Sequence, residues 1–254
     1  MGLVRICNGK DTKMSRSKVA VVTGGAQGIG RAICAAFAEQ GVAVCTIDKL
    51  DNDYFVGDIA EEEVLRAFAA KVLTEHASID YLVNNACLSC GGLQSCGYED
   101  FNYVLRTGVT APFFLTKLFS EHFNTGASIV NISSTRQQMS QPDTESYTAA
   151  KGGISALTHA MAVSLAGKAR VNSISPGWIH TGSTPPDGPD AAQHPVGRVG
   201  TVGDIVNAVM FLCDPRSGFI TGQDLVVDGG MTKQMIYHND HGWRLENISR
   251  EKEI

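Results

Sequence analysis

Tyr147 and Lys151 are the two side chains of this sequence best suited to acid-base chemistry. They stand four residues apart, and residues at that spacing lie on one face of an α-helix. A phenol ordinarily titrates near ~10 and is a poor base at neutral pH. A nearby ammonium favours the phenolate and lowers the pKa of the phenol, which makes it a usable proton shuttle for an alcohol or a carbonyl group. By itself, however, such a pair is more often a solvated helix face.

A glycine-rich segment upstream could hold the phosphates of a dinucleotide. Residues 23–30 read T-G-G-A-Q-G-I-G and lie between a β-branched run and a helical pattern. Glycines let the backbone approach a pyrophosphate, and the N-terminus of the following helix favours the anion. The spacing is not the strict G-x-G-x-x-G, and structural turns also use glycine.

Asp48 ends the second apolar run, where a carboxylate can accept hydrogen bonds from both ribose hydroxyls of an adenosine. The same negative charge would repel a 2′-phosphate, so we expect NAD as the cofactor. Lys49 follows directly and leaves room for a minor activity with NADP. A surface aspartate is the alternative. Together with the Tyr147 and Lys151 pair, this pattern predicts a nicotinamide-dependent oxidoreductase.

The elements that must position these residues alternate between strands and helices. Apolar and β-branched runs predict strands at 18–23, 42–47, 54–56, 79–84, 127–132, 169–174 and 224–227. Helical periodicity predicts helices at 29–40, 61–74, 100–123, 145–166 and 203–213. Such alternation predicts an α/β fold, a single-domain, doubly wound (Rossmann-type) parallel sheet with helices on both faces.

The remaining segments carry little periodicity. Residues 182–200 contain four prolines among polar residues and predict a long mobile loop of the kind that closes over a site. We expect an N-terminal appendage at 1–17, one dinucleotide-binding and catalytic domain at 18–232, and a C-terminal tail at 233–254.

Composition narrows the class of partner. The net charge is −5, so the chain has no excess of basic residues that would favour nucleic acid or an anionic membrane as a partner. A small-molecule ligand fits better. No apolar run approaches the ~20 residues that span a bilayer. We therefore expect a cytoplasmic protein with no membrane partner.

Seven cysteines, without a secretory signal, are most simply reduced thiols. Cys87 and Cys90 form a C-x-x-C pair, with Cys96 close by, which could be a redox couple or half of a zinc site. No second pair of ligands is evident, so no metal is expected. A redox or zinc protein built on these cysteines remains a third interpretation.

The order of the motifs resembles that of the short-chain dehydrogenase/reductase family over about residues 18–232. The motifs are the glycine segment at 23–30, Asp58-Ile59, Asn84-Asn85-Ala86, Ser134, Tyr147 with Lys151, Pro176-Gly177, Arg198 with Asp204-Ile205, and 221–230. Several motifs in one order make the resemblance specific.

The resemblance implies a role for each matching residue. Tyr147 would be the general acid/base, Lys151 would bind the nicotinamide ribose and lower the pKa of the tyrosine, and Ser134, rather than Ser133, would orient the substrate oxygen. The implied cofactor-binding residues are Gly24, Gln27, Gly28, Ile29, Gly30, Asp48, Asp58, Ile59, Asn85, Ala86, Tyr147, Lys151, Pro176, Gly177, Ile179 and Thr181. It also implies a homo-oligomer, a tetramer or dimer, formed through the helices at 100–123 and 145–166.

The sequence departs from the family pattern at two positions. Gly108 stands where the family has a catalytic asparagine, and Cys87 replaces the glycine of Asn-Asn-Ala-Gly. That asparagine helps to hold a water that connects the lysine to solvent. We expect that serine, tyrosine and lysine still function while the proton relay is rebuilt, with a kink at Gly108 leaving room for a water or another polar group. The alternative is a catalytically impaired NAD-binding sensor or scaffold of the same fold.

The side chains expected around the substrate are polar, which argues against a steroid or fatty-acyl pocket. They are Thr135, Arg136, Gln137, Gln138, Asp143, Glu145, His180 and His194. We therefore expect hydride transfer between NAD and a secondary alcohol or ketone, in a sugar, polyol or other small hydroxylated substrate.

Overall fold

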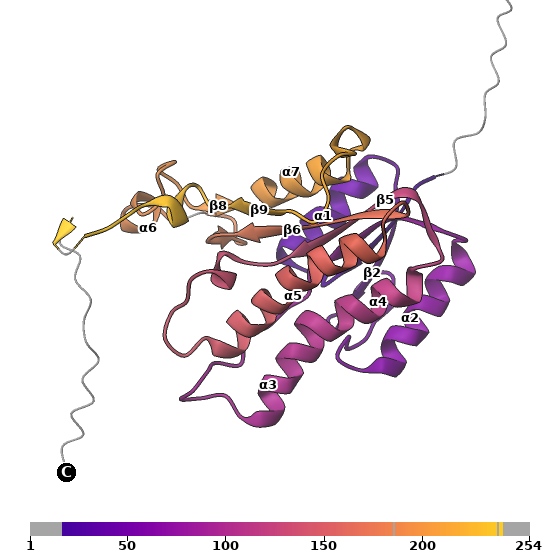
Figure 1. Ribbon diagram of the computed structural model, residues 1–254, viewed down its shortest axis with the longest axis horizontal. Helices are drawn as coiled ribbons and strands as arrows, with labels where there is room; N and C mark the ends of the chain where they lie inside the picture. Colours follow the sequence, from indigo (N-terminus) through magenta and orange to yellow (C-terminus); the bar gives the residue numbers. More distant parts are fainter. Residues whose placement is uncertain (1–16, 185, 238, 241–254) are drawn as a thin grey trace, which may run out of the picture.

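Seven parallel strands form the central sheet of the computed structural model, which describes residues 17–184, 186–237 and 239–240 (Figure 1). The strand order is β3-β2-β1-β4-β5-β6-β9, so the chain moves outward from β1 and then returns to β1's other side at β4. The strands are β1 Val19–Thr23, β2 Ala43–Asp48, β3 Phe55–Val56, β4 Ile79–Asn84, β5 Phe123–Ile132, β6 Ala169–Pro176 and β9 Asp224–Val227. The predicted doubly wound sheet is confirmed. Residues 1–16 of the expected appendage and 241–254 of the expected tail lie outside the described residues.

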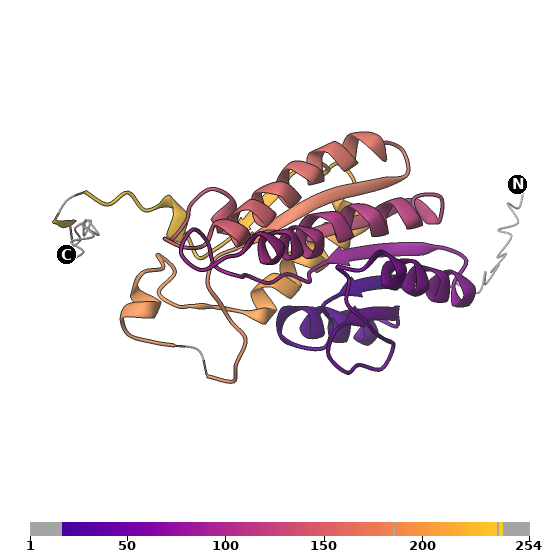
Figure 2. The same ribbon diagram turned by 90° about the horizontal axis from the view of Figure 1, so that it is seen from below.

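Helices cover both faces of this sheet (Figure 1, Figure 2). One face packs against α1 Gly28–Glu39 and α7 Val202–Cys213, and the other against α2 Glu62–Glu75, α4 Ala111–Phe119 and α5 Glu145–Ser164. Successive side chains of a strand point to opposite faces. In β1, accordingly, Val19 and Val21 belong to the core under α2, α4 and α5, whereas Ala20 and Val22 belong to the core under α1 and α7.

The single helix predicted over 100–123 is wrong in two respects. The chain forms α3 Tyr98–Leu105, then a π-helical turn at Arg106–Thr110, and then α4, which ends at Phe119. Phe123 already belongs to β5, where it pairs with Ile79. Ser120, Glu121 and His122 interrupt the apolar pattern after Phe119, but periodicity alone could not show that residue 123 has a partner in a distant strand.

The predicted loop over 182–200 contains more regular structure than its prolines indicate. Pro189–Ala192 forms the short helix α6, and β8 Gly200–Thr201 pairs in parallel with β7 Ile179–His180. Thr201 then caps α7 through a reciprocal hydrogen-bonded pair with Asp204. The C-terminal end of the segment is thus held against the domain by a short strand pair and by the capped N-terminus of α7.

Over the part of the chain that the structure describes, no helix combines the length and apolarity required to cross a bilayer.

Candidate functional site

The predicted site residues gather at one edge of the sheet, where the parallel strands end. The glycine turn follows β1, Asp48 ends β2, Asn85 follows β4, Ser134 follows β5 and Pro176 ends β6. In doubly wound sheets, ligands bind in the crevice outside the carboxyl ends of the strands, where the strand order reverses. Here the order reverses between β1 and β4, beside the glycine turn.

Tyr147 and Lys151 are neighbours on α5, as their spacing predicts. The Lys151 Nζ lies 5.3 Å from the centre of the Tyr147 ring. Lys151 is only 4% exposed, and its Nζ donates a 2.7 Å hydrogen bond to the Ile132 carbonyl at the end of β5. The half-buried phenol therefore has a fixed positive charge beside it.

The turn that begins at Ser134 packs against the same tyrosine. Ser134 caps the short 3-10 turn Thr135–Gln137 by accepting a hydrogen bond from the Arg136 N–H, and the Arg136 guanidinium carbon lies 5.8 Å from the centre of the Tyr147 ring. The hydroxyl of Ser133 lies elsewhere: it donates to the Lys151 carbonyl at 2.9 Å and lies 2.7 Å from the Ser155 hydroxyl. Ser133 thus connects the end of β5 to α5 through hydrogen bonds. Of the two serines, Ser134 is the one whose hydroxyl lies in the turn beside Tyr147.

The glycine turn is compact and its helix N-terminus is uncapped. A Cβ at Gly30 would lie 2.0 Å from the Gly24 carbonyl oxygen, so only glycine fits there. Asn85 holds the turn by donating from Nδ2 to the Thr23 and Gly24 carbonyls at 3.1 Å each. At the N-terminus of α1, Gln27 makes no side-chain capping bond and the first turn holds no acidic residue. These free N–H groups suit the pyrophosphate of a dinucleotide.

Two carboxylates were expected to bind the adenosine part of the cofactor. Asp48 accepts from the Ala26 and Leu50 N–H groups, at 3.0 Å each, which places it against the glycine segment. Asp58 accepts from the Tyr103 hydroxyl at 2.7 Å and pairs with the Lys49 ammonium at 3.2 Å. Burial raises the pKa of Asp58, but hydrogen bonds from the Ala60 N–H, Tyr103 and Lys49 outweigh it and hold the pKa below its ordinary value.

The segment after β6 reaches back to the glycine turn. Gly177 donates to the Val227 carbonyl at 3.0 Å, and a Cβ there would lie 2.9 Å from the Asp228 Cα, so the chain can pass β9 only with glycine at this position. A Cβ at Gly28 would lie 3.5 Å from the Thr181 side chain. Ile179 is half-buried in β7, whereas Ile59 is buried in the core, so only its backbone can face a cofactor.

Several of the polar residues expected around the substrate have other partners. Asp143 accepts from the Gly92 and Gln94 N–H groups, Glu145 accepts from the Leu93 N–H, and Gln137 donates to Ser175 and Asp224. Thr135 and His194 are buried. Asp143 and Glu145 therefore hold the loop after β4, and Arg136 remains beside Tyr147.

Some contributors to the site had no signal in the sequence analysis. Tyr103 bonds to Asp58 from α3, which no spacing indicated. Asn131 accepts from Asn84 and donates to Thr158, both at 2.8 Å, and so connects β4, β5 and α5 through buried amides. A polar residue inside an apolar strand is the signal that could have identified Asn131.

The cysteines within the described residues are free thiols. No group of three or more His, Cys, Asp or Glu residues in that part of the chain could hold a metal ion. Burial raises the pKa of Cys213 to about 12 and, with the nearby Asp100 and Cys96, raises that of Cys90. Neither thiol is prepared for redox chemistry at neutral pH.

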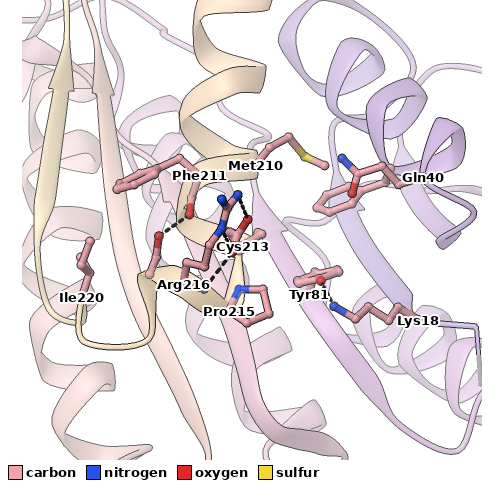
Figure 3. Close-up of a pocket in the computed structure, with 12 residues that line it drawn as sticks. Lys18, Gln40, Tyr81, Met210, Phe211, Cys213, Pro215, Arg216 and Ile220 are labelled. Carbon is pink, nitrogen blue, oxygen red and sulfur yellow. Dashed lines mark hydrogen bonds and ion pairs between the residues drawn. The ribbon is translucent and has the colours of Figure 1, made fainter. Parts of the chain in front are cut away.

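A cavity of about 740 Å³ lies at the opposite edge of the sheet, at the amino ends of the strands (Figure 3). Lys18, which donates to the Tyr81 hydroxyl at 2.5 Å, and Arg216, which pairs with Asp214, are its basic residues, and Met210, Phe211 and Ile220 are among its apolar ones. None of the predicted site residues lines it.

Comparison with known proteins places the chain in a family. The family model described as enoyl-(acyl carrier protein) reductase matches residues 24–232. An uncharacterized oxidoreductase of Thermotoga maritima is 41% identical over 88% of this chain and 99% of its own length. The chain belongs to the short-chain dehydrogenase/reductase family. It is an oxidoreductase of that type.

Solved structures of similar short-chain dehydrogenase/reductases agree with this fold. An apo short-chain oxidoreductase from Clostridium thermocellum has a TM-score of 0.82 and 42% identity, over 91% of this chain and 99% of that one. A 4-hydroxyisoleucine dehydrogenase was solved with NADH (TM-score 0.77, 27% identity, 86% and 100% covered). A blue fluorescent protein from a metagenomic library was solved with NADPH (TM-score 0.77, 27% identity, 84% and 97% covered). The family uses a nicotinamide cofactor.

Gly108, where the short-chain dehydrogenase/reductase pattern has asparagine, lies in the π-helical turn. This turn interrupts the regular α-helical hydrogen bonding at the position of the expected kink. A Cβ at Gly108 would lie 2.9 Å from the Ala150 Cβ and 3.7 Å from the Cys87 Sγ. Helix α5 thus occupies the position of the missing side chain, and the expected room for another polar group is not next to the Gly108 Cα.

Proposed function

We propose that the protein transfers hydride reversibly between NAD and a secondary alcohol or ketone, in a small hydroxylated substrate such as a sugar, a polyol or a similar compound. The observation that supports this most is the buried Lys151 ammonium beside the Tyr147 ring, on the helix face next to the Ser134 turn. An ammonium in that place stabilises the phenolate that acid-base chemistry requires.

The residues of the crevice fit a nicotinamide dinucleotide. The uncapped N-terminus of α1 offers N–H groups to the pyrophosphate, and the cofactor, when bound, accepts or supplies the hydride. Asp48 supports NAD rather than NADP, because its charge would repel a 2′-phosphate. Lys49 does not offset this charge, since its ammonium is paired with Asp58 and bonded to Tyr103 at 2.6 Å.

In the proposed mechanism three side chains have separate tasks. Ser134 donates its hydroxyl proton in a hydrogen bond to the substrate oxygen and so orients the substrate. Tyr147 takes the hydroxyl proton during oxidation and returns it during reduction. Lys151, held by the Ile132 carbonyl, keeps its charge beside the phenolate and binds the ribose with its remaining donors.

The proton relay must differ from that of the family, because Gly108 has no side chain. The adjacent Thr107 offers a replacement: its hydroxyl is buried and has no hydrogen-bond partner among the described residues. A buried hydroxyl of this kind is commonly satisfied by an ordered water. We propose that such a water continues the path from Lys151 towards solvent.

An absorbance screen of alcohols and ketones with NAD and, separately, with NADP tests this function. We expect turnover with NAD to exceed turnover with NADP, and Tyr147→Phe to lower kcat by roughly 100-fold to 10,000-fold because the proton shuttle is removed. Tyr98→Phe is the matched control, since Tyr98 is 81% exposed on α3. NADH binding, followed by fluorescence, should persist in both variants. A Tyr147→Phe enzyme with wild-type turnover would refute the mechanism.

A second function is favoured by Gly108 alone: an NAD-binding sensor or scaffold that no longer turns over. It predicts NADH binding with no turnover for any member of the panel.

The acidic net charge of −5 supports a small molecule, rather than nucleic acid or an anionic membrane, as the partner in either case. A cytoplasmic location is part of the same proposal.

A further inference from the structure

Arg136 is a cation beside the proposed acid/base with no carboxylate of its own. Its guanidinium carbon lies 5.8 Å from the centre of the Tyr147 ring, and its side chain donates to the Gln141 amide oxygen. No ion pair joins it to a carboxylate of the described residues. Arg66, Arg198 and Arg216 each pair with an aspartate or glutamate. Arg170 likewise has no carboxylate partner in that part of the chain, but it donates to two backbone carbonyls away from Tyr147.

The two nearest acidic residues in sequence are occupied with a loop. Asp143 accepts from the Gly92 N–H at 3.0 Å, the Gln94 N–H at 2.8 Å and the Ser95 hydroxyl at 2.7 Å. The Ser95 and Gln94 hydrogen bonds hold the pKa of Asp143 below its ordinary value. Glu145 accepts from the Leu93 N–H at 3.2 Å. Both carboxylates are thus directed at residues 92–95, and neither neutralises Arg136.

The chemistry of a guanidinium narrows what it can bind. Arginine offers hydrogen-bond donors in a planar fork and no acceptor, and this fork matches the two oxygens of a carboxylate. A neutral polyol hydroxyl would leave the charge of Arg136 unbalanced. A phosphate monoester carries about −1.5 to −2 charges at neutral pH. A single guanidinium without an ion pair balances the one charge of a carboxylate better, because Lys151 is buried and already assigned to Tyr147.

We propose that Arg136 binds a carboxylate of the substrate, so that the alcohol oxidised beside Tyr147 belongs to a small hydroxy acid, sugar acids included. This inference rests on the proposed function and narrows its substrate class. Arg136 would then be a specificity-determining residue: it binds the acid group while Ser134 and Tyr147 bind the reacting oxygen. Its position two residues after Ser134 in the same turn keeps the two binding points together.

Matched substrate pairs test the proposal. We would compare 3-hydroxybutyrate with butane-1,3-diol, and gluconate with sorbitol, and include sorbitol 6-phosphate as the phosphate arm. The enzymes are the wild type, Arg136→Gln, Arg136→Lys and the control Arg216→Gln, which removes one positive charge at the opposite edge of the sheet. Two readouts are taken: kcat/KM with NAD, and binding of each compound to the enzyme with NADH bound.

We expect the wild type to prefer at least one acid over its neutral partner, and Arg136→Gln to lower kcat/KM for that acid on the order of 100-fold, mainly through KM. The neutral partner should change by less than about 3-fold, since it makes no charged contact. Arg136→Lys should recover part of the loss, and Arg216→Gln should match the wild type.

Four results would overturn the proposal, the last of which is given with its counterpart for the proposed function. Acid and neutral members bound and turned over alike by the wild type would show that there is no carboxylate site. An equal loss for both members in Arg136→Gln would show that Arg136 acts on Tyr147 instead. Preference for sorbitol 6-phosphate over gluconate would assign the residue to phosphate. Binding of the acid that depends on Arg136 but leads to no turnover would support the carboxylate site and refute the proposed function, whereas turnover unaffected by Arg136→Gln would do the reverse.

Discussion

At the scale of single residues, Gly108 shows how the absence of a side chain can be a packing requirement. A Cβ there would meet the Ala150 Cβ at 2.9 Å, a contact too short to persist. Ala150 lies on α5 between Tyr147 and Lys151. A side chain at Gly108 would therefore displace the helix that presents the acid/base pair, and the effect would reach both stability and turnover.

We predict that Gly108→Ala lowers the free energy of unfolding by about 1–3 kcal/mol, because overpacking outweighs the helix propensity of alanine. Gly152→Ala is the control: a Cβ at Gly152 meets nothing within 4 Å, so this change should stabilise α5 by up to about 1 kcal/mol. Urea denaturation measures both. Equal free energies of unfolding for Gly108→Ala and Gly152→Ala would contradict a packing role for Gly108.

The contact between residue 108 and Ala150 also affects the test in which the family asparagine is restored at position 108. Gly108→Asn alone should lose stability and kcat together, while Gly108→Asn combined with Ala150→Gly should lose less than the sum of the two single changes. Turnover that appears only in the double variant would support the sensor or scaffold interpretation.

At the scale of elements, local structure marks the start of two helices: a π-helical turn precedes α4, and a capping box begins α7. The π-helical turn at 106–110 separates α3 from α4, and such turns are frequent at functional sites. Helix α7 begins with a capping box, in which Asp204 accepts from the Thr201 N–H at 2.8 Å. Arg198 adds a bidentate contact to the same carboxylate, at 2.8 and 2.7 Å. The end of the 182–200 segment is thereby joined to α7.

We predict that Asp204→Asn lowers the free energy of unfolding by about 1 kcal/mol at neutral pH, a typical value for a lost cap. The Arg198 hydrogen bonds, opposed by burial, hold the pKa of Asp204 far below its ordinary value. A group with a lowered folded pKa contributes fully above its unfolded pKa, near ~3.9, and loses that contribution as the pH falls below it. The difference between wild type and variant should therefore shrink from pH 7 to pH 3 in urea denaturation. A difference that stays constant would contradict this assignment.

At the scale of the whole molecule, apolar side chains remain exposed on the outer faces of both helical layers. Phe113 on α4 is 47% exposed and Val163 on α5 is 77% exposed, on the layer through which the resemblance implies an oligomer would form. On the other layer, Phe211 of α7 is 51% exposed. Exposed apolar side chains of this kind are suited to subunit contacts, and two such faces allow a dimer or a tetramer.

We predict a sedimentation mass that is a multiple of the 27.1 kDa chain. The double variant Phe113→Glu and Val163→Glu should shift it towards the single chain, because two charges cannot be buried unpaired at an interface. Leu93→Glu is the control, since Leu93 is 90% exposed in the loop after β4. A wild-type protein that sediments as a single chain at about 10 µM would contradict the proposed oligomer.

Much of the architecture follows from the sequence because its signals are local. The β-branched run before Gly24 and the helical spacing of Ile33 and Phe37 after it are readable within about ten residues, and both sit where the pattern predicts. The proximity of Tyr147 to Lys151 is equally local, since one helical turn joins them. The doubly wound fold follows from this alternation, whereas the strand order is known only from the structure.

Contacts between distant segments were decided only by the tertiary structure. Phe123 became a strand residue because Ile79 pairs with it, and the side-chain position at Gly108 is closed because Ala150 of another helix occupies it. Asp143 and Glu145 are bound to the loop at 92–95, which leaves Arg136 as the cation without a carboxylate beside Tyr147. Residue type and spacing determine which groups could do chemistry, but the partners that occupy or free those groups lie far away in sequence. Only the folded chain brings them within hydrogen-bonding distance.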